Sequence, residues 1–226
     1  MRMSSPDPHG ALIAQLVADA APLRRLWSPA ARLVAWAVLL GGMLIAIAAS
    51  AGWPFGAVTR APWLAWELAC ALAAAVLWAG LALGAAVPGR EASRRARLGA
   101  AVLAALPIAF WLGGPASEAE LPLRVFIERG IPCAVLTLAL ALLPSLALLW
   151  AVGRGAPLAP RRAGAWAGAA GFLTGYLLMR IFCPLNDPAH LLIWHVGPVA
   201  LGIGACAALG SWWLARWRRW RPTRSV

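Results

Sequence analysis

No charged residue interrupts the run Ile131-Pro-Cys-Ala-Val-Leu-Thr-Leu-Ala-Leu-Ala-Leu-Leu-Pro-Ser-Leu-Ala-Leu-Leu-Trp-Ala-Val152. A run of about 18 or more apolar residues is long enough to cross the hydrocarbon core of a bilayer as a helix. Similar runs recur along the chain, which is 62% hydrophobic and 12% charged. Soluble domains are about 45–50% apolar and about 25% charged. The composition therefore predicts a polytopic membrane protein and excludes a soluble globular domain.

Six such runs predict an all-α fold, a bundle of six transmembrane helices. The predicted spans are Leu33–Ala51, Trp63–Val87, Leu98–Leu112, Ile131–Val152, Ala163–Cys183 and Ala189–Ala215. In the fifth span, glycines recur at three- and four-residue spacing from Gly164 to Gly175, so that neighbouring helices can approach closely and this helix should be central. The expected domains are an N-terminal segment (residues 1–30), the transmembrane domain (31–215) and a basic tail (216–226).

The arginines predict the orientation of the bundle. The net charge is +12, and every basic residue is an arginine. Most lie before the first span, after the second and fourth spans, and after the sixth; only Arg60, Arg124, Arg129 and Arg180 lie on the opposite side. Basic loops favour the cytoplasm, so both termini are predicted to be cytoplasmic. The basic charge then serves topology and contact with the lipid bilayer, and no direct binding of nucleic acid is expected.

Ahead of the first span, residues Ala11–Ala21 carry an apolar stripe at helical spacing. The stripe consists of Leu12, Ile13, Leu16 and Val17 and continues at Ala20. This pattern predicts a short amphipathic cytoplasmic helix that stops before Pro22. A helix of this length is marginal in water by itself. It should therefore lie against a partner, the bilayer surface or the rest of the protein.

A thiol, a carboxylate and two imidazoles fall within Ile181–His195. The topology places Cys133, in the first turn of the fourth span, level with Cys183 at the end of the fifth. The short link from Cys183 makes His190 its neighbour. Thiolate and imidazole ligands suit soft ions such as copper, zinc or cadmium. We expect such an ion to bind transiently, with no permanently bound cofactor; a disulfide is the alternative chemistry. A helix N-terminus at Cys133 would favour its thiolate.

Two polar residues of this stretch, and one residue outside it, have two interpretations each. Asp187 precedes a proline, as a helix N-cap does, or it supports the metal site. His195 forms a hydrogen bond within the bundle, or it acts as a ligand or gate. Glu67 pairs with Arg60 or Arg180, or it serves as a hard ligand.

Several motifs together resemble the NrsF family of six-span bacterial inner-membrane anti-sigma factors. They occur in the same order over nearly the whole chain. They are Leu12-Ile-Ala-Gln-Leu-Val-Ala-Asp-Ala-Ala-Pro22-Leu-Arg24-Arg25-Leu26, Val87-Pro-Gly-Arg90, Gly130-Ile-Pro-Cys133, Arg154-Gly-Ala-Pro157, and Cys183-Pro184 with His190 and Trp194-His195.

The resemblance implies that the cytoplasmic side holds an extracytoplasmic-function sigma factor inactive at the inner membrane. It also implies that heavy-metal or redox stress, detected through Cys133 and Cys183, releases the sigma factor. We expect the sigma factor to bind the N-terminal segment. The residues assigned to this contact are Leu12, Ile13, Leu16, Val17, Asp19, Arg24 and Arg25.

Two other classes fit the sequence less well. A small membrane metal-binding or transport protein is the alternative, but a transport path needs ionisable residues through the membrane, and the first, third and fifth spans are nearly bare. A thiol oxidoreductase is expected to carry a Cys-x-x-Cys motif, which this sequence lacks. The sequence also lacks a Ser-His-Asp set, a phosphate loop and a paired-carboxylate site. We therefore expect no enzymatic activity.

Overall fold

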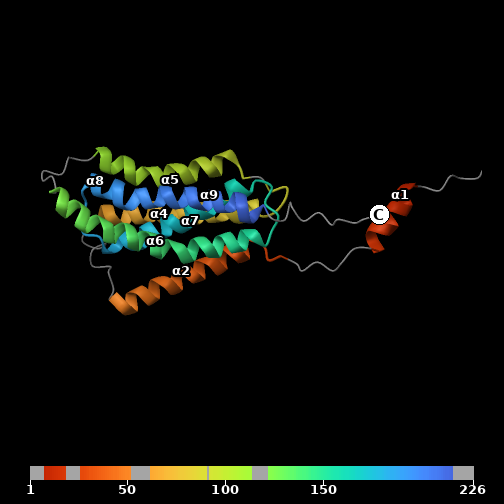
Figure 1. Ribbon diagram of the computed structural model, residues 1–226, viewed down its shortest axis with the longest axis horizontal. Helices are drawn as coiled ribbons and strands as arrows, with labels where there is room; N and C mark the ends of the chain where they lie inside the picture. The colour runs from red at the N-terminus through yellow and green to blue at the C-terminus, as the bar shows by residue number, and fades with distance from the viewer. Residues whose placement is uncertain (1–7, 19–25, 52–61, 91, 114–121, 216–226) are drawn as a thin grey trace, which may run out of the picture.

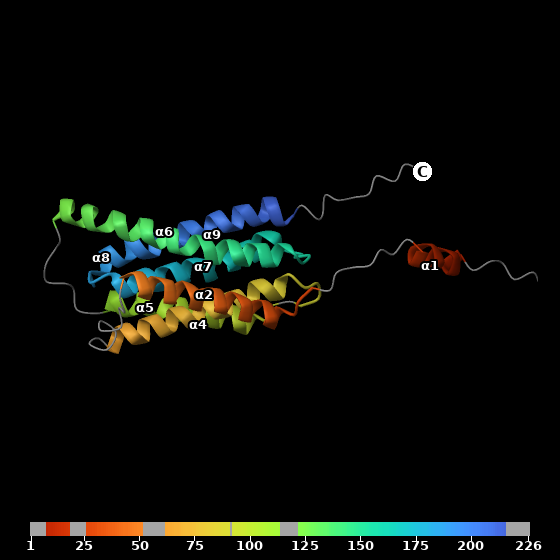
Figure 2. The same cartoon turned by 90° about the horizontal axis from the view of Figure 1, so that it is seen from below.

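The computed structural model describes residues 8–18, 26–51, 62–90, 92–113 and 122–215. These residues are almost entirely helical and contain no strand. Six of the helices are long and apolar enough to cross a membrane, and they lie side by side as a bundle (Figures 1 and 2). The predicted fold class is therefore confirmed. The first five spans are single helices: α2 (Pro29–Ala51), α4 (Pro62–Ala85), α5 (Arg94–Gly113), α6 (Leu123–Gly153) and α7 (Pro160–Phe182). The sixth span consists of four consecutive helical segments: α8 (Pro188–Leu191), η1 (Leu192–Val196), α9 (Gly197–Leu209) and η2 (Gly210–Leu214).

The start of α6 differs from the prediction. The helix begins at Leu123 and not at Ile131, while the bounds of the other five spans agree with the prediction to within about four residues. Its first two turns carry three charged residues, Arg124, Glu128 and Arg129, among apolar ones, and Arg124 forms an ion pair with Glu128 at 2.7 Å. The prediction was wrong because Pro132 was taken as a helix start. A proline inside a helix removes one hydrogen bond, and α6 continues through this position.

Helix α7 occupies the centre of the bundle, as the glycine spacing predicts. It contacts α4, α6 and α9, and 72% of its apolar stretch is buried, the largest share among the six spans. A Cβ atom on Gly175 would lie 2.5 Å from the Thr137 carbonyl oxygen of α6, and one on Gly168 would lie 2.6 Å from Cys206 Cβ of α9. The glycines therefore allow two different helices to approach α7 closely.

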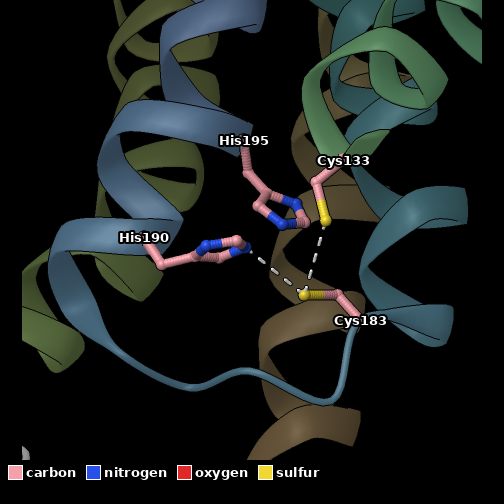
Figure 3. A group of neighbouring side chains, drawn as sticks. All are labelled: Cys133, Cys183, His190 and His195. Atoms are coloured by element: carbon pink, nitrogen blue, oxygen red, sulfur yellow. Dashed lines mark hydrogen bonds between the residues drawn. The ribbon is translucent and has the colours of Figure 1, made fainter. Parts of the chain in front are cut away.

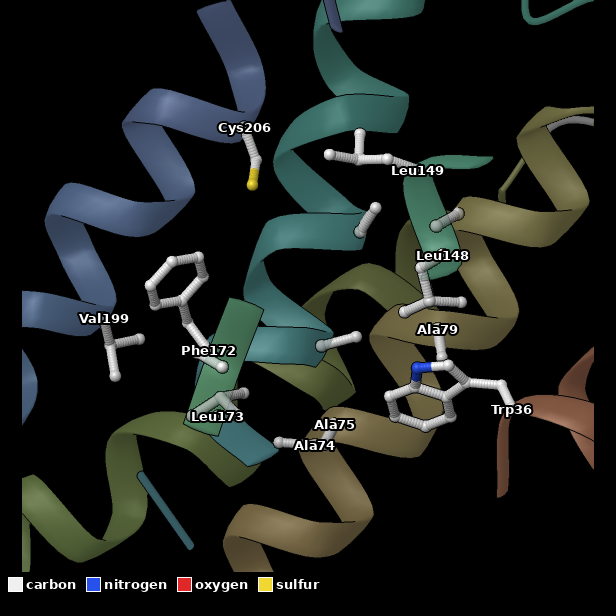
Figure 4. Close-up of a cluster of buried hydrophobic side chains, with 14 of the residues drawn as sticks. Trp36, Ala74, Ala75, Ala79, Leu148, Leu149, Phe172, Leu173, Val199 and Cys206 are labelled. Atoms are coloured by element: carbon white, nitrogen blue, oxygen red, sulfur yellow. The ribbon is translucent and has the colours of Figure 1, made fainter. Parts of the chain in front are cut away.

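One apolar core connects α2, α4, α6, α7 and α9 (Figure 4). Leu148 of α6 and Phe172 of α7 belong to it, and Cys206 of α9 lies among these hydrocarbon side chains. Helix α2 is peripheral, because only 11% of its apolar stretch is buried. Its main inward side chain is Trp36, whose indole N–H donates to the Pro144 carbonyl oxygen at 3.1 Å.

The helix termini form two opposite ends of the bundle (Figure 1). We call one the basic end; it holds the start of α2 with Arg32, the start of α5 and the end of α6 with Arg154. We call the other the cluster end; it holds the end of α7 and the start of α8. The first span starts, and the last span finishes, at the basic end. Which compartment each end faces stays a prediction.

Helix α1 (Pro8–Ala18) precedes the bundle and covers most of the predicted amphipathic helix. The four residues of its apolar stripe are each more than half exposed. Residues 19–25 lie outside the described residues, and with them Asp19, Arg24 and Arg25. The structure therefore describes α1 as a helix whose apolar stripe is uncovered.

We expect Gly175→Val to destabilise the protein, because the added side chain would meet the backbone of α6. Overpacking of this kind costs about 1–3 kcal/mol. The midpoint of thermal unfolding in detergent should fall by several degrees. Gly204→Val is the matched control on α9, where an added Cβ meets nothing within 4 Å. Equal shifts in the two variants would contradict close packing at Gly175.

Candidate metal-binding site

Four side chains converge at the cluster end (Figure 3). They are Cys133 of α6, Cys183 at the end of α7, His190 of α8 and His195 of η1, and together they form the Cys/His cluster. Their ligand atoms all lie within 4.8 Å of one another. The two sulfur atoms are 3.9 Å apart, and Cys183 Sγ lies 3.7 Å from His190 Nε2. The predicted proximity of the two cysteines and His190 is therefore observed, and both thiols are free.

The link between α7 and α8 brings Cys183 and His190 together. Cys183 ends α7 in an extended conformation, and Pro184, which follows it, cannot donate a backbone hydrogen bond. Asp187 then caps α8: its carboxylate accepts a hydrogen bond from the His190 backbone N–H at 2.7 Å. Pro188 occupies the first turn of α8. Asp187 is thus the N-cap that the sequence predicts, and its carboxylate lies outside the group of four ligands.

A π-helical turn brings His195 to the same side as His190. In an α-helix, residues five positions apart point about 140° away from each other. In η1 the Gly197 N–H donates to the Leu192 carbonyl, five residues earlier, so that residues at this spacing lie above one another. Pro198 favours the wider turn, because it has no N–H to offer to the preceding turn. The two imidazole rings lie with their centroids 5.4 Å apart.

The cluster is buried, and several of its polar atoms lack protein partners. Cys133 and Cys183 are 7% and 6% exposed, and both histidines are fully buried. Among the described residues, His190 Nδ1 and both ring nitrogens of His195 have no hydrogen-bond partner. The alternative in which His195 forms a hydrogen bond within the bundle is therefore wrong. Leaving a buried polar atom unpaired costs about 1–3 kcal/mol. Coordination of an ion would satisfy such nitrogens.

Two aromatic side chains cover the cluster on the side of α6. The Phe126 and His190 rings are perpendicular, with their centroids 6.2 Å apart, and the centroid of Phe126 lies 5.8 Å from that of Trp194. Trp194 lies directly over Gly130, where any Cβ atom would overlap the indole ring. This contact gives a physical reason for the glycine in the Gly130-Ile-Pro-Cys133 motif. Phe126 was not identified from the sequence, because it lies outside the predicted span.

A buried ion pair between Arg180 and Glu67 positions the backbone at Cys183. Arg180 Nε donates to Glu67 Oε1 at 2.9 Å, and both side chains are only 1% exposed. The same guanidinium donates to the Cys183 carbonyl oxygen at 3.0 Å and to Asn186 Oδ1 at 2.7 Å. Arg180 therefore connects two parts of the chain to α4: the end of α7 and the link that follows it. From the sequence, Arg180 is one of the arginines that indicate topology and a possible partner of Glu67. The structure confirms its pairing with Glu67.

Glu67 is fully engaged by neighbouring side chains. Besides Arg180, the Tyr176 hydroxyl donates to Glu67 Oε1, and the Trp111 indole N–H donates to Oε2 at 3.3 Å. These contacts tie α4 to α5 and α7. Glu67 lies outside the group of four ligands, so the structure gives no support to a role as a hard ligand. Tyr176 is the only tyrosine of the chain, a sequence signal that could have drawn attention to it.

The expected helix N-terminus at Cys133 is absent, because Cys133 lies ten residues into α6. The helix dipole acts mainly within the first turn. The prediction that it favours a thiolate at Cys133 is therefore wrong. The early start of α6 does not displace Cys133 from the cluster end, since the first turns of α6 extend past the end of α7 (Figure 2).

The fold and the site define a six-span helical membrane protein with a buried Cys₂His₂ cluster that could bind a metal ion. Residues 16–220 match the family described as NrsF, negative regulator of sigma F. Because the match covers nearly the whole chain, the protein belongs to this family. No curated protein and no solved structure matches the chain.

Replacing Arg180 with Met should leave Glu67 buried without its ionic partner. Breaking a buried pair in this way costs about 3–5 kcal/mol, which a free energy of unfolding measured in detergent will show. Arg124→Met is the matched control, since it removes an exposed pair worth about 0–1 kcal/mol. Adding Glu67→Gln to Arg180→Met should restore part of the loss. The buried network has no structural role if the two single variants lose the same free energy.

Proposed function

We propose that this protein is an anti-sigma factor of the inner membrane and that a soft metal ion in the Cys/His cluster weakens its hold on a sigma factor. In this proposal the cluster end faces the periplasm, and the basic end, with both termini, faces the cytoplasm. The orientation is supported by the arginine-rich loops of the basic end. The observation that carries the sensing role is the convergence of four soft-metal ligands within 4.8 Å.

The family indicates which partner the protein binds, and helix α1 indicates where it binds. The family description names a negative regulator of a sigma factor, and we propose an extracytoplasmic-function sigma factor as the target. The apolar stripe of α1 is uncovered, with Leu16 62% and Val17 69% exposed. An amphipathic helix commonly binds a partner by laying its apolar face in a hydrophobic groove. Asp19, Arg24 and Arg25 would extend this contact in the segment that follows.

The spacing of the ligands suits a tetrahedral ion. Zinc–sulfur and zinc–nitrogen bonds of about 2.3 and 2.0 Å place two tetrahedral sulfurs about 3.8 Å apart and a sulfur and a nitrogen about 3.5 Å apart. The corresponding distances here are 3.9 Å between the cysteines and 3.7 Å from Cys183 Sγ to His190 Nε2. The four ligand atoms together span up to 4.8 Å, so the side chains that lie farther apart would move closer to complete the coordination.

The charge of the cluster favours a divalent ion. Two thiolates and two neutral imidazoles carry two negative charges, which one divalent ion cancels. The neighbouring pair of Arg180 and Glu67 is itself neutral. A buried site with no net charge avoids most of the cost of removing charge from water. Among the soft ions that sulfur and imidazole select, zinc and cadmium therefore fit better than monovalent copper.

Ion binding would couple the two ends of the bundle through three spans. The ligands come from α6, the end of α7 and the sixth span, so an ion fixes the relative positions of these helices. The sixth span is irregular at both ends, with the π-helical turn η1 beside the cluster and η2 at the basic end. Rigid helices then carry the adjustment to the basic end. A coupling free energy of about 1–3 kcal/mol would weaken sigma-factor binding by about 5- to 150-fold.

Oxidation of the two thiols is the redox alternative. A disulfide bond of about 2.05 Å requires the sulfur atoms to approach by almost 2 Å. The reaction releases two protons and transfers two electrons to an external oxidant. An ion needs little approach, and it also engages the two histidines, which a disulfide leaves unpaired. Metal binding therefore explains the positions of all four side chains, whereas a disulfide explains only those of the two cysteines.

Cadmium titration of the purified protein should show one ion per chain, with the ultraviolet absorption of cadmium–thiolate bonds. Cys133→Ser and Cys183→Ser should each weaken binding by more than about a hundredfold. Cys206→Ser is the matched control, because this buried thiol lies in the apolar core. Unchanged affinity in the first two variants would refute the metal site. Uptake of cadmium into sealed vesicles would instead favour the alternative of a transport protein.

Removal of residues 1–26 should abolish co-purification of the sigma factor with the membrane domain. A sharper variant combines Leu12→Ser with Leu16→Ser, which removes half of the apolar stripe while keeping the chain length. We expect at least a tenfold loss of sigma-factor affinity, since burial of each leucine contributes about 1.5–3 kcal/mol. Gln15→Ala, a change outside the stripe on the same helix, should leave affinity unchanged. Full binding by the truncated chain would exclude the N-terminal segment as the contact.

A further inference from the structure

A cavity of about 500 Å³ lies at the basic end between α2 and α6. Its volume falls within the range of small-molecule sites, about 300–1,000 Å³. Most of its wall is apolar or aromatic, and two arginines complete it. The lining comprises Leu26, Trp27, Arg32, Ala35, Trp36, Leu39, Ala147, Trp150, Ala151 and Arg154. The cavity is separate from the Cys/His cluster, which lies at the other end of the bundle.

Arg32 is buried in this wall, and none of the carboxylates that the structure describes pairs with it. Its side chain is 7% exposed, and it donates to the Ala151 carbonyl at 2.9 Å and the Leu83 carbonyl at 3.4 Å. Its Nε atom is buried and has no hydrogen-bond partner. The described carboxylates, Glu67, Glu128 and Asp187, belong to the cluster end. A buried cation with unused donors favours an anion nearby.

The geometry points to a binding site for one anionic membrane phospholipid between α2 and α6. Its phosphodiester lies at Arg32 and Arg154, and one acyl chain follows Trp36, Leu39 and Ala147 toward the middle of the bundle. Arginine binds phosphate oxygens through charge-assisted hydrogen bonds. From Arg32 to Leu39 the helix rises about 10 Å, so the polar and apolar parts of the site follow one another along α2.

The position of the site suits a lipid better than a soluble anion. Trp27 and Trp150, 68% and 57% exposed, stand at the mouth of the cavity, and tryptophan is enriched at the level of lipid headgroups. Arg154 lies 4.9 Å over the Trp150 ring, which holds the second guanidinium at the same level. A free phosphate would use the arginines and leave the apolar wall uncovered.

A lipid in this site would contribute to the packing of α2. This helix has only 11% of its apolar stretch buried within the protein. An acyl chain between α2 and α6 would fill the space beside Trp36, the side chain that anchors α2 to Pro144. Because α2 directly follows the N-terminal segment, the lipid would also fix the point from which that segment leaves the membrane.

Native mass spectrometry can test the site by counting lipids retained by the full-length protein. The probe is an equimolar mixture of phosphatidylglycerol and phosphatidylcholine. We expect one phosphatidylglycerol per chain, retained in preference to phosphatidylcholine. Arg32→Gln should weaken this binding by about tenfold, as expected for the loss of charge-assisted hydrogen bonds. Arg154→Gln changes an exposed side chain, so the protein will fold, and it should also weaken binding.

Arg161→Gln is the matched control, since it removes the same charge from an exposed position at the basic end. It should leave retention within about twofold of the original protein. Equal retention of the two lipids would overturn the proposal, as would an equal loss in Arg161→Gln and Arg154→Gln. Complete displacement of the lipid by millimolar inorganic phosphate would also overturn it, because the site would then bind a free anion.

Discussion

The arrangement of the cluster end depends on the pairing of Arg180 with Glu67. A guanidinium in the membrane region has no water to bind, so its donors must find acceptors inside the protein. The guanidinium of Arg180 donates hydrogen bonds to Glu67 of α4, to the Cys183 carbonyl and to Asn186. The last carbonyl groups of a helix lack partners within that helix. One side chain therefore completes the end of α7, fixes the direction of the following link and sets the position of the Cys183 thiol.

The protein separates a ligand site and a candidate partner-binding helix at opposite ends of one bundle. Close packing at the glycines of α7 joins α6 and α9 to a single central helix. Helix α6 and the end of α7 supply the two cysteines of the Cys/His cluster, and α8 and η1, which precede α9 in the sixth span, supply the two histidines. A change in their relative positions at one end must therefore be taken up along the bundle or at its other end, because closely packed interiors deform little. Helix α2 has the smallest buried share of the six spans, 11%.

The sequence predicted the features that follow from hydropathy, topology and short links. The six spans, the central position of α7 and the proximity of Cys183 and His190 are of this kind. Cys133 was also placed level with Cys183, although the start of its helix was predicted eight residues too late. That error arose because charged residues interrupt the apolar run in the first turns of α6, and because a proline within a helix resembles a proline at its start.

Other features of the site depend on tertiary packing and could not be predicted from one sequence. The π-helical turn that aligns His195 with His190 is defined by the hydrogen bond from the Gly197 N–H to the Leu192 carbonyl, which no sequence pattern predicts. The contact of Trp194 with Gly130 joins helices far apart in sequence. The pairing of Arg180 with Glu67 depends on the relative rotation of α4 and α7, which hydropathy does not give. Arg60, the other predicted partner of Glu67, lies outside the described residues.

The central claim is that the metal ion and the sigma factor bind antagonistically. Linkage requires the effect to be reciprocal, so a bound sigma factor must weaken metal binding by the same factor by which the metal weakens sigma-factor binding. The most direct measurement is the cadmium affinity of the protein in nanodiscs, with and without saturating sigma factor. The account predicts an affinity at least about fivefold lower in the complex. Identical affinities in the two states would contradict it.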